Sequence, residues 1–127
     1  KVMTPKETVQ FIYDAFASGD MEKFASVFSE DCICVMNGMH AVSGTYHGRD
    51  ALMTQMMARV GKHFPDGVAF EKVKMFAEGN NVFTMGTIKA DGLEMSVGHH
   101  HVVEDGKVKE MHIFDDSQKW AMTLKPM

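Results

Sequence analysis

Three turn signals in the second half of the chain constrain the fold most strongly. They combine glycine with asparagine or aspartate, residues that readily adopt the left-handed backbone conformations of tight hairpins. The turns are Gly79-Asn80-Asn81, Asp91-Gly92 and Asp105-Gly106. β-prone segments flank them, at residues 68–78, 82–90, 93–104 and 107–115. The sequence therefore predicts an antiparallel meander of four strands.

Residues 93–104 alternate most clearly between two faces. Apolar residues and two histidines occupy the odd positions, whereas the even positions are mostly polar. The odd set is Leu93, Met95, Val97, His99, His101 and Val103. We therefore expect His99 and His101 to point into the protein.

The first half of the chain carries helical signals instead. Thr4-Pro5-Lys6-Glu7 supplies a hydroxyl N-cap, a proline at the first helical position and the glutamate of a capping box. Gly19 ends this helix, and Asp20 caps a second, shorter one. A third helix is predicted to start after Asp50 and to break at Gly61.

Residues 32–36 form a short β-prone run, and residues 37–48 are interpreted as a long glycine-rich loop. Three helices followed by a curved meander predict one α+β domain, residues 1–127, with the helices on one face of a mostly antiparallel sheet. A hollow between the two layers is where we expect the functional site. The tail, residues 116–127, is expected to form a short helix or to cover the opening.

Composition narrows the classes of partner. The formal net charge is −4 and only two arginines are present, which argues against nucleic-acid binding. Apolar runs are too short to span a membrane, and no signal-peptide core opens the sequence. We therefore expect a soluble, cytoplasmic protein without a membrane partner.

Sulfur-containing residues are interpreted as apolar lining. Cys32 and Cys34 are separated by one residue, a spacing that disfavours both a mutual disulfide and a redox motif, so we expect two reduced thiols. The 13 methionines indicate either an adaptable cavity or ordinary core packing.

Four local motifs carry a resemblance to a known family. They are residues 16–24 (FASGDMEKF), 28–31 (FSED), 44–52 (GTYHGRDAL) and 104–108 (EDGKV). In this order and spacing they resemble the nuclear transport factor 2-like superfamily, and within it the SnoaL-like group that includes polyketide cyclases. The resemblance covers nearly the whole chain. It implies a cystatin-like cone and, because relatives often dimerise, a homodimer.

The resemblance does not extend to one set of catalytic residues. By similarity to ketosteroid isomerase, a more distant relative, the catalytic tyrosine and two aspartates would fall at Ile12, Met36 and roughly His99. Tyr13 is one residue from the tyrosine position, which turns its side chain about 100° around the helix. The resemblance therefore implies a pocket rather than the steroid isomerase reaction.

His99, His101 and Asp115 are the candidate acid and base residues. A two-residue turn at Asp105-Gly106 would place His100 beside Met111, whereas a three-residue turn would place His99 there. Asp115 resembles an aspartate that many SnoaL-like chains carry at the end of the last strand. In an apolar cavity its pKa would rise, although a capping or solvated role is the alternative.

Metal binding is the competing interpretation of the histidines. A metal held by His99 and His101 would need a third ligand, for which His112 and Asp115 are the nearest candidates. We favour proton transfer and expect neither a metal nor a cofactor.

The candidate site also includes hydrogen-bond donors that could orient a carbonyl or enolate oxygen. Apolar residues are expected to form its wall. The expected ligand contacts are Tyr13, Phe16, Met36, Tyr46, Met56, Met111, Ile113 and Trp120. The expected function is binding of a hydrophobic cyclic or carbonyl-bearing molecule, with cofactor-free isomerisation, cyclisation, dehydration or hydrolysis. The alternative is a non-catalytic binding module or a dimerising association module.

Overall fold

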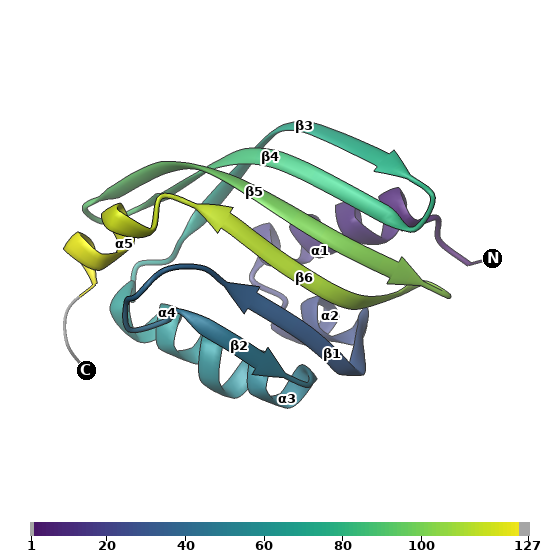
Figure 1. The fold of residues 1–127 in the computed structure, drawn as a ribbon, viewed down its shortest axis with the longest axis horizontal. Coiled ribbons are helices and arrows are strands. Elements are labelled where there is room, and N and C mark those ends of the chain that lie inside the picture. The colour runs from purple at the N-terminus through teal and green to yellow at the C-terminus, as the bar shows by residue number, and fades with distance from the viewer. Residues whose placement is uncertain (1, 125–127) are drawn as a thin grey trace.

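In the computed structural model, which describes residues 2–124, helices cover one face of a six-stranded sheet (Figure 1). The strands are β1 (Phe28–Met36), β2 (Gly44–His47), β3 (Ala69–Glu78), β4 (Asn81–Ala90), β5 (Leu93–Glu104) and β6 (Lys107–Asp115). The helices are α1 (Pro5–Ser18), α2 (Met21–Ser26), α3 (Arg49–Ala51), the π-helical η1 (Leu52–Met57), α4 (Ala58–His63) and α5 (Ser117–Thr123). The predicted α+β architecture is confirmed.

The sheet order is β2-β1-β6-β5-β4-β3. Strands β3 to β6 form the predicted antiparallel meander, and β1 joins it by a parallel pairing with β6. β1 is longer than the run predicted at residues 32–36. The expected loop at residues 37–48 contains β2, which pairs with β1. That part of the prediction was wrong, because the pairing with β1 stabilises a glycine-containing segment of low intrinsic strand propensity.

The first two helices begin and end as predicted. Thr4 and Glu7 form the capping box of α1, and Gly19 ends the helix with a left-handed φ of 74°. Asp20 caps α2 by accepting a hydrogen bond from the amide of Lys23 at 3.0 Å.

The third helical segment differs from its prediction. It begins after Gly48 rather than Asp50, contains the π-helical η1, and continues through Gly61 to His63. Glycine inside a helix costs only about 1 kcal/mol relative to alanine. Burial of Leu52 on the same segment outweighs that cost.

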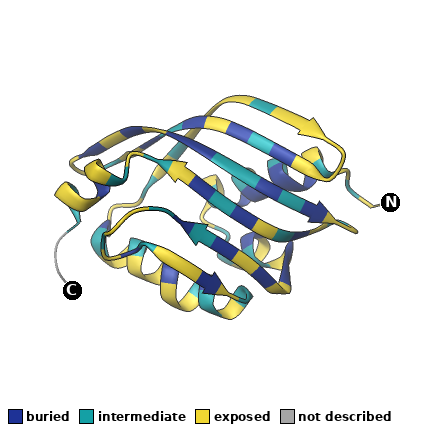
Figure 2. Cartoon of the chain, in the orientation of Figure 1, coloured by how far each residue is buried: buried dark blue, intermediate teal, exposed yellow. Residues whose placement is uncertain are grey.

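The register between β5 and β6 also corrects the prediction. The turn has two residues, with Glu104 opposite Lys107, but the register then shifts by one residue between Val102 and Val103. The bulge on β6 places His101, rather than His100 or His99, opposite Met111. The odd face of β5 nevertheless points inward, and its residues are buried except for the half-buried His99. Figure 2 shows the buried and exposed stretches of this strand.

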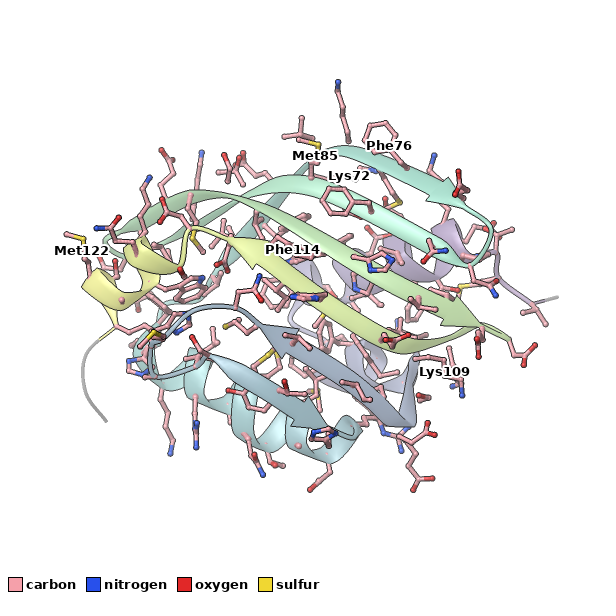
Figure 3. The ribbon with its side chains drawn as sticks, in the orientation of Figure 1. Lys72, Phe76, Met85, Lys109, Phe114 and Met122 are labelled. Atoms are coloured by element: carbon pink, nitrogen blue, oxygen red, sulfur yellow. The ribbon has the colours of Figure 1, made fainter. Side chains whose placement is uncertain are left out.

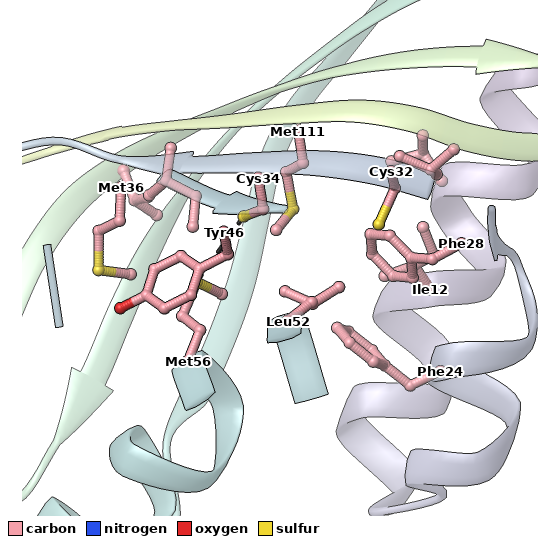
Figure 4. Packing of buried hydrophobic residues seen from close by; sticks show 14 of the residues in the cluster. Ile12, Phe24, Phe28, Cys32, Cys34, Met36, Tyr46, Leu52, Met56 and Met111 are labelled. Carbon is pink, nitrogen blue, oxygen red and sulfur yellow. Dashed lines mark hydrogen bonds between the residues drawn. The ribbon is translucent and has the colours of Figure 1, made fainter. Parts of the chain in front are cut away.

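The core lies between the sheet and the helices (Figure 4). Phe28 and Leu52 are fully buried. Cys32 and Cys34 are free thiols inside this core, as predicted, and Cys34 Sγ lies 3.7 Å from Met56 Sδ. Within residues 2–124, no helix combines the length and apolar character needed to cross a membrane.

The tail prediction is confirmed over the part that the structure describes. Asp116 caps α5 by accepting a hydrogen bond from the amide of Lys119 at 3.1 Å. The predicted tail residues 125–127, and residue 1 of the predicted domain, lie outside the described residues.

Candidate functional site

A cavity of about 100 Å³ lies between the inner face of the sheet and the helices. Its wall is predominantly apolar. The sheet side is Met36, Phe70, Ile88, Val97, His99, His101, Met111, Ile113 and Asp115. The remaining lining residues are Ile12, Tyr13, Phe16, Phe24, Met56, Met57, Val60, Val68 and Trp120.

The structure brings together every predicted site residue except Tyr46. The Tyr46 side chain is buried in the core, where its hydroxyl donates to the carbonyl of Val42 at 2.6 Å. The prediction missed this placement because it did not include β2. It also missed apolar wall residues such as Phe70 and Val97, since periodicity does not distinguish a core position from a cavity wall.

Tyr13 on α1 and His99 on β5 form a hydrogen-bonded pair, with 2.8 Å between Tyr13 Oη and His99 Nδ1. Phe70 stacks on both rings, with centroid distances of 4.3 Å to Tyr13 and 5.3 Å to His99. The pair contains one phenol proton and, in neutral imidazole, one ring proton. The hydrogen bond between Tyr13 and His99 uses one of these two protons. In either imidazole tautomer the other proton therefore stays available for donation to a ligand.

Both members of this pair are neutral at pH 7. Burial lowers the pKa of His99 to about 4. Burial also raises the pKa of the Tyr13 hydroxyl, an effect that the nearby Thr84 hydroxyl opposes. His99 retains some accessible surface, which is consistent with its position on the cavity wall.

His101 has no exposed surface, and neither of its ring nitrogens has a hydrogen-bond partner among the described residues. Its ring is edge-on to Tyr13 and His99, with centroid distances of 6.2 Å and 6.1 Å. Burial lowers the pKa of His101, and the neighbouring His99 and His100 lower it further. A buried polar group without a partner costs about 1–3 kcal/mol, so this ring is the most unusual feature of the wall.

Asp115 places a carboxylate at the end of β6. Its Oδ2 accepts a hydrogen bond from Trp120 Nε1 at 2.7 Å, whereas its buried Oδ1 has no partner within residues 2–124. Burial raises the pKa of Asp115, the Trp120 bond lowers it, and Asp116 raises it. The capping role considered for Asp115 belongs instead to Asp116.

Sheet register places the carboxylate near the tyrosine–histidine pair. His99 lies opposite Ile113, and Val97 lies opposite Asp115. His99 and Asp115 are therefore diagonal neighbours on one face, a relationship that separates side chains by roughly 7–8 Å. A small ligand between them could contact a proton donor and a proton acceptor at once.

The structure does not assemble the considered metal site. His112 lies directly opposite His100, on the other face of the sheet, and its Nε2 lies 2.8 Å from Asn37 Oδ1. Across residues 2–124, no group of three or more histidine, cysteine, aspartate or glutamate side chains is placed to hold a metal ion.

Comparisons with known proteins agree with this fold. A family model described as a SnoaL-like domain matches residues 9–111. No curated protein matches the chain at a significant level.

Several solved structures are similar. A Xanthomonas campestris protein of unknown function with a cystatin-like fold shares 23% identity, with a TM-score of 0.88 and coverage of 98% of this chain and 100% of the other. TerC, co-crystallised with polyporic acid, shares 21% identity, with a TM-score of 0.83 and coverage of 94% and 98%.

A Sinorhizobium meliloti protein described as a candidate polyketide cyclase shares 16% identity, with a TM-score of 0.72 and coverage of 84% and 93%. Further similar structures are described as NTF2-like proteins. At these identities the likeness to solved structures shows the fold alone.

Proposed function

Because this chain belongs to the SnoaL-like domain family, we propose that its cavity binds a small hydrophobic molecule, cyclic or bearing a carbonyl group, and transfers a proton on it without a cofactor. One observation carries this proposal: an apolar wall presents buried polar atoms without partners among the described residues. These atoms are both ring nitrogens of His101 and Oδ1 of Asp115. A ligand with polar groups would supply the missing hydrogen bonds.

The proposed roles follow from protonation states. The Asp115 carboxylate takes the proton from a carbon next to the ligand carbonyl, and its raised pKa suits it to this role. The Tyr13–His99 pair donates its remaining proton in a hydrogen bond to the resulting enolate oxygen. Protonated Asp115 then returns the proton to the same or a neighbouring carbon, which gives exchange or isomerisation. Cyclisation, dehydration and hydrolysis require the same acid and base groups.

Deuterium exchange tests this chemistry. Cyclic ketones incubated with the protein in D2O should exchange the hydrogens next to the carbonyl faster than in buffer, as measured by NMR. Asp115→Asn should abolish the acceleration. Asp20→Asn is the matched control, because Asp20 lies outside the cavity and asparagine caps a helix as well as aspartate does.

The alternative is a non-catalytic binding module of the same fold. It is favoured by Ile12 and Met36, which occupy positions where the resemblance to ketosteroid isomerase implies catalytic residues. Binding of a ketone without accelerated exchange, and with unchanged affinity in Asp115→Asn, would support the alternative and contradict the catalytic proposal.

We also propose that the outer face of the sheet pairs with a second copy of the chain. Met85, Gly98 and Phe114 form one row across three strands of this face. The Phe83 ring covers Gly98. Met85 and Phe114, both labelled in Figure 3, are 45% and 43% exposed. Light scattering should give a dimer that Phe114→Glu converts to a monomer. Met122→Glu, at an exposed position on α5, is the control. A monomeric wild type would contradict this proposal.

A further inference from the structure

We infer that the ligand of this cavity is an uncharged molecule of about one six-membered ring, carrying a hydroxyl or ketone oxygen that binds at Tyr13, His99 and His101. This inference rests on the proposed binding function and narrows its substrate class. Size, charge and hydrogen-bonding capacity each support it independently.

Cavity size limits the ligand. The volume is about 100 Å³. An apolar protein cavity of about 150 Å³ holds benzene, so this smaller one favours a single ring over a fused polycyclic skeleton and takes that ring with some adjustment of its wall. Met36, Met56 and Met111 on the wall can adjust their rotamers to the shape of a ring.

Charge limits the ligand further. None of the described lysine or arginine residues lines the cavity, so a bound carboxylate would have no cation to pair with. The Asp115 carboxylate would also repel an anion. An ammonium ligand could pair with the Asp115 carboxylate, but it has no acceptor for the N–H of the His101 ring. Burying a poorly paired charge costs far more than burying a neutral polar group.

Hydrogen-bonding capacity excludes a plain hydrocarbon as the best ligand. Neutral His101 offers one donor and one acceptor, and neither is used by the described residues. The Tyr13–His99 pair, about 6 Å from His101 between ring centroids, offers one further proton. A ligand hydroxyl both donates and accepts hydrogen bonds, and a ketone oxygen accepts them. Either group can therefore form hydrogen bonds with His101 and with the Tyr13–His99 pair.

The cluster of Tyr13, His99 and His101 and the Asp115 carboxylate lie at different points along the sheet. His101 lies four residues along β5 from Val97, the residue opposite Asp115. At ~3.3 Å per residue, their positions on the sheet are roughly 13 Å apart. An oxygen bound at His101 and the intervening His99 therefore directs the ring along the apolar wall toward Asp115, the base of the proposed proton transfer.

The fluorescence of Trp120 provides a direct test, because it is the one tryptophan of the chain and it lines the cavity. Non-fluorescent saturated rings serve as probes. The neutral probes are cyclohexanol and cyclohexanone, the charged ones are cyclohexanecarboxylate and cyclohexylammonium, and 2-decalone is the two-ring probe. Isothermal titration calorimetry measures the same affinities independently.

We expect cyclohexanol and cyclohexanone to bind at least about tenfold more tightly than either charged probe, and more tightly than 2-decalone. His101→Leu should weaken cyclohexanol binding roughly tenfold and leave the binding of cyclohexane unchanged or tighter. His100→Leu, the next residue on the opposite face of the same strand, should change neither affinity.

The outcomes separate this inference from the proposed function. Preferential binding of a charged probe or of 2-decalone, or unchanged cyclohexanol affinity in His101→Leu, would overturn the inference while leaving a ligand-binding cavity. Failure of every probe to bind would overturn the inference and the binding function together.

Discussion

The hydroxyl of Tyr13 lies 2.8 Å from Nδ1 of His99, in a contact between the first helix and β5 that spans 86 residues of sequence. Neither partner occupies a charged state at pH 7, since burial lowers the pKa of His99 to about 4 and raises that of Tyr13. The pair is therefore a fixed, neutral proton donor on the cavity wall.

Tyr13→Phe should remove this bond and destabilise the protein by about 1 kcal/mol. It should also weaken ketone binding, because the remaining imidazole loses its orientation. Tyr46→Phe is the matched control, since it loses a comparable hydrogen bond to Val42 outside the cavity. Urea unfolding and ketone titration measure the two effects. Equal loss of ketone affinity in both variants would contradict a site-specific role for Tyr13.

Folding stability should fall on acidification below pH of about 6.5, the ordinary histidine pKa. Because burial lowers the pKa values of His99 and His101, the unfolded chain binds more protons than the folded one in this range. The stability is fully present above this pH and is lost as the pH falls toward about 4, the pKa of His99. For His99 the loss is on the order of 3 kcal/mol.

Asp115 acts in the opposite direction, because its raised pKa adds stability that is lost as the pH rises through that value. Urea midpoints between pH 7 and pH 4.5 measure the net slope. Replacing both His99 and His101 with leucine should flatten it, whereas His100→Leu should not. An unchanged slope in the double variant would assign the acid sensitivity to other groups.

His101→Leu alone should stabilise the ligand-free protein by about 1 to 3 kcal/mol. Leucine fills a similar volume and removes a buried ring that has no hydrogen-bond partner among the described residues. The urea midpoint should therefore rise while cyclohexanol binding weakens. Destabilisation would mean that the ring nitrogens are already satisfied, for example by buried water.

Gly86→Ala should disturb the ring stack beside the pair. An added Cβ at Gly86 would lie 2.5 Å from Phe70 Cζ and 2.5 Å from the carbonyl oxygen of Glu71, so the backbone would have to move. We expect a loss of about 1–3 kcal/mol and weaker ketone binding. At Gly61, nothing lies within 4 Å of an added Cβ, and Gly61→Ala should stabilise α4 by roughly 0.5–1 kcal/mol.

Much of the fold could be predicted because local chemistry encodes it. The turn at Asp105-Gly106 and the alternation around His99 suffice to predict paired strands and an inward face. The bulge at Lys109 could not be predicted, because the extra residue of β6 is accommodated by neighbouring strands rather than by a local signal. The π-helical turn at residues 52–57 likewise has no signal in the local sequence that distinguishes it from an α-helix.

The site was less predictable than the fold. The alternation of residues 93–104 identified the inward-facing histidines. Because β2 was not predicted, however, Tyr46 was assigned to the ligand wall, although it lies in the core. The partnership of Asp115 with Trp120 depends on where α5 begins, which Asp116 determines. The Tyr13–His99 bond depends on the orientation of a helix over the sheet, which one sequence does not specify.

The parallel pairing of β1 with β6 has a consequence for the newly synthesised chain. Met36 meets its neighbour Ile113 only after the 76 residues between them have left the ribosome. Until then the methionine-bearing strand has one edge unpaired, and an incomplete chain exposes the surface that later encloses the cavity. Long-range pairing of this kind slows folding, and a truncated product lacking β6 would be prone to aggregation through that edge.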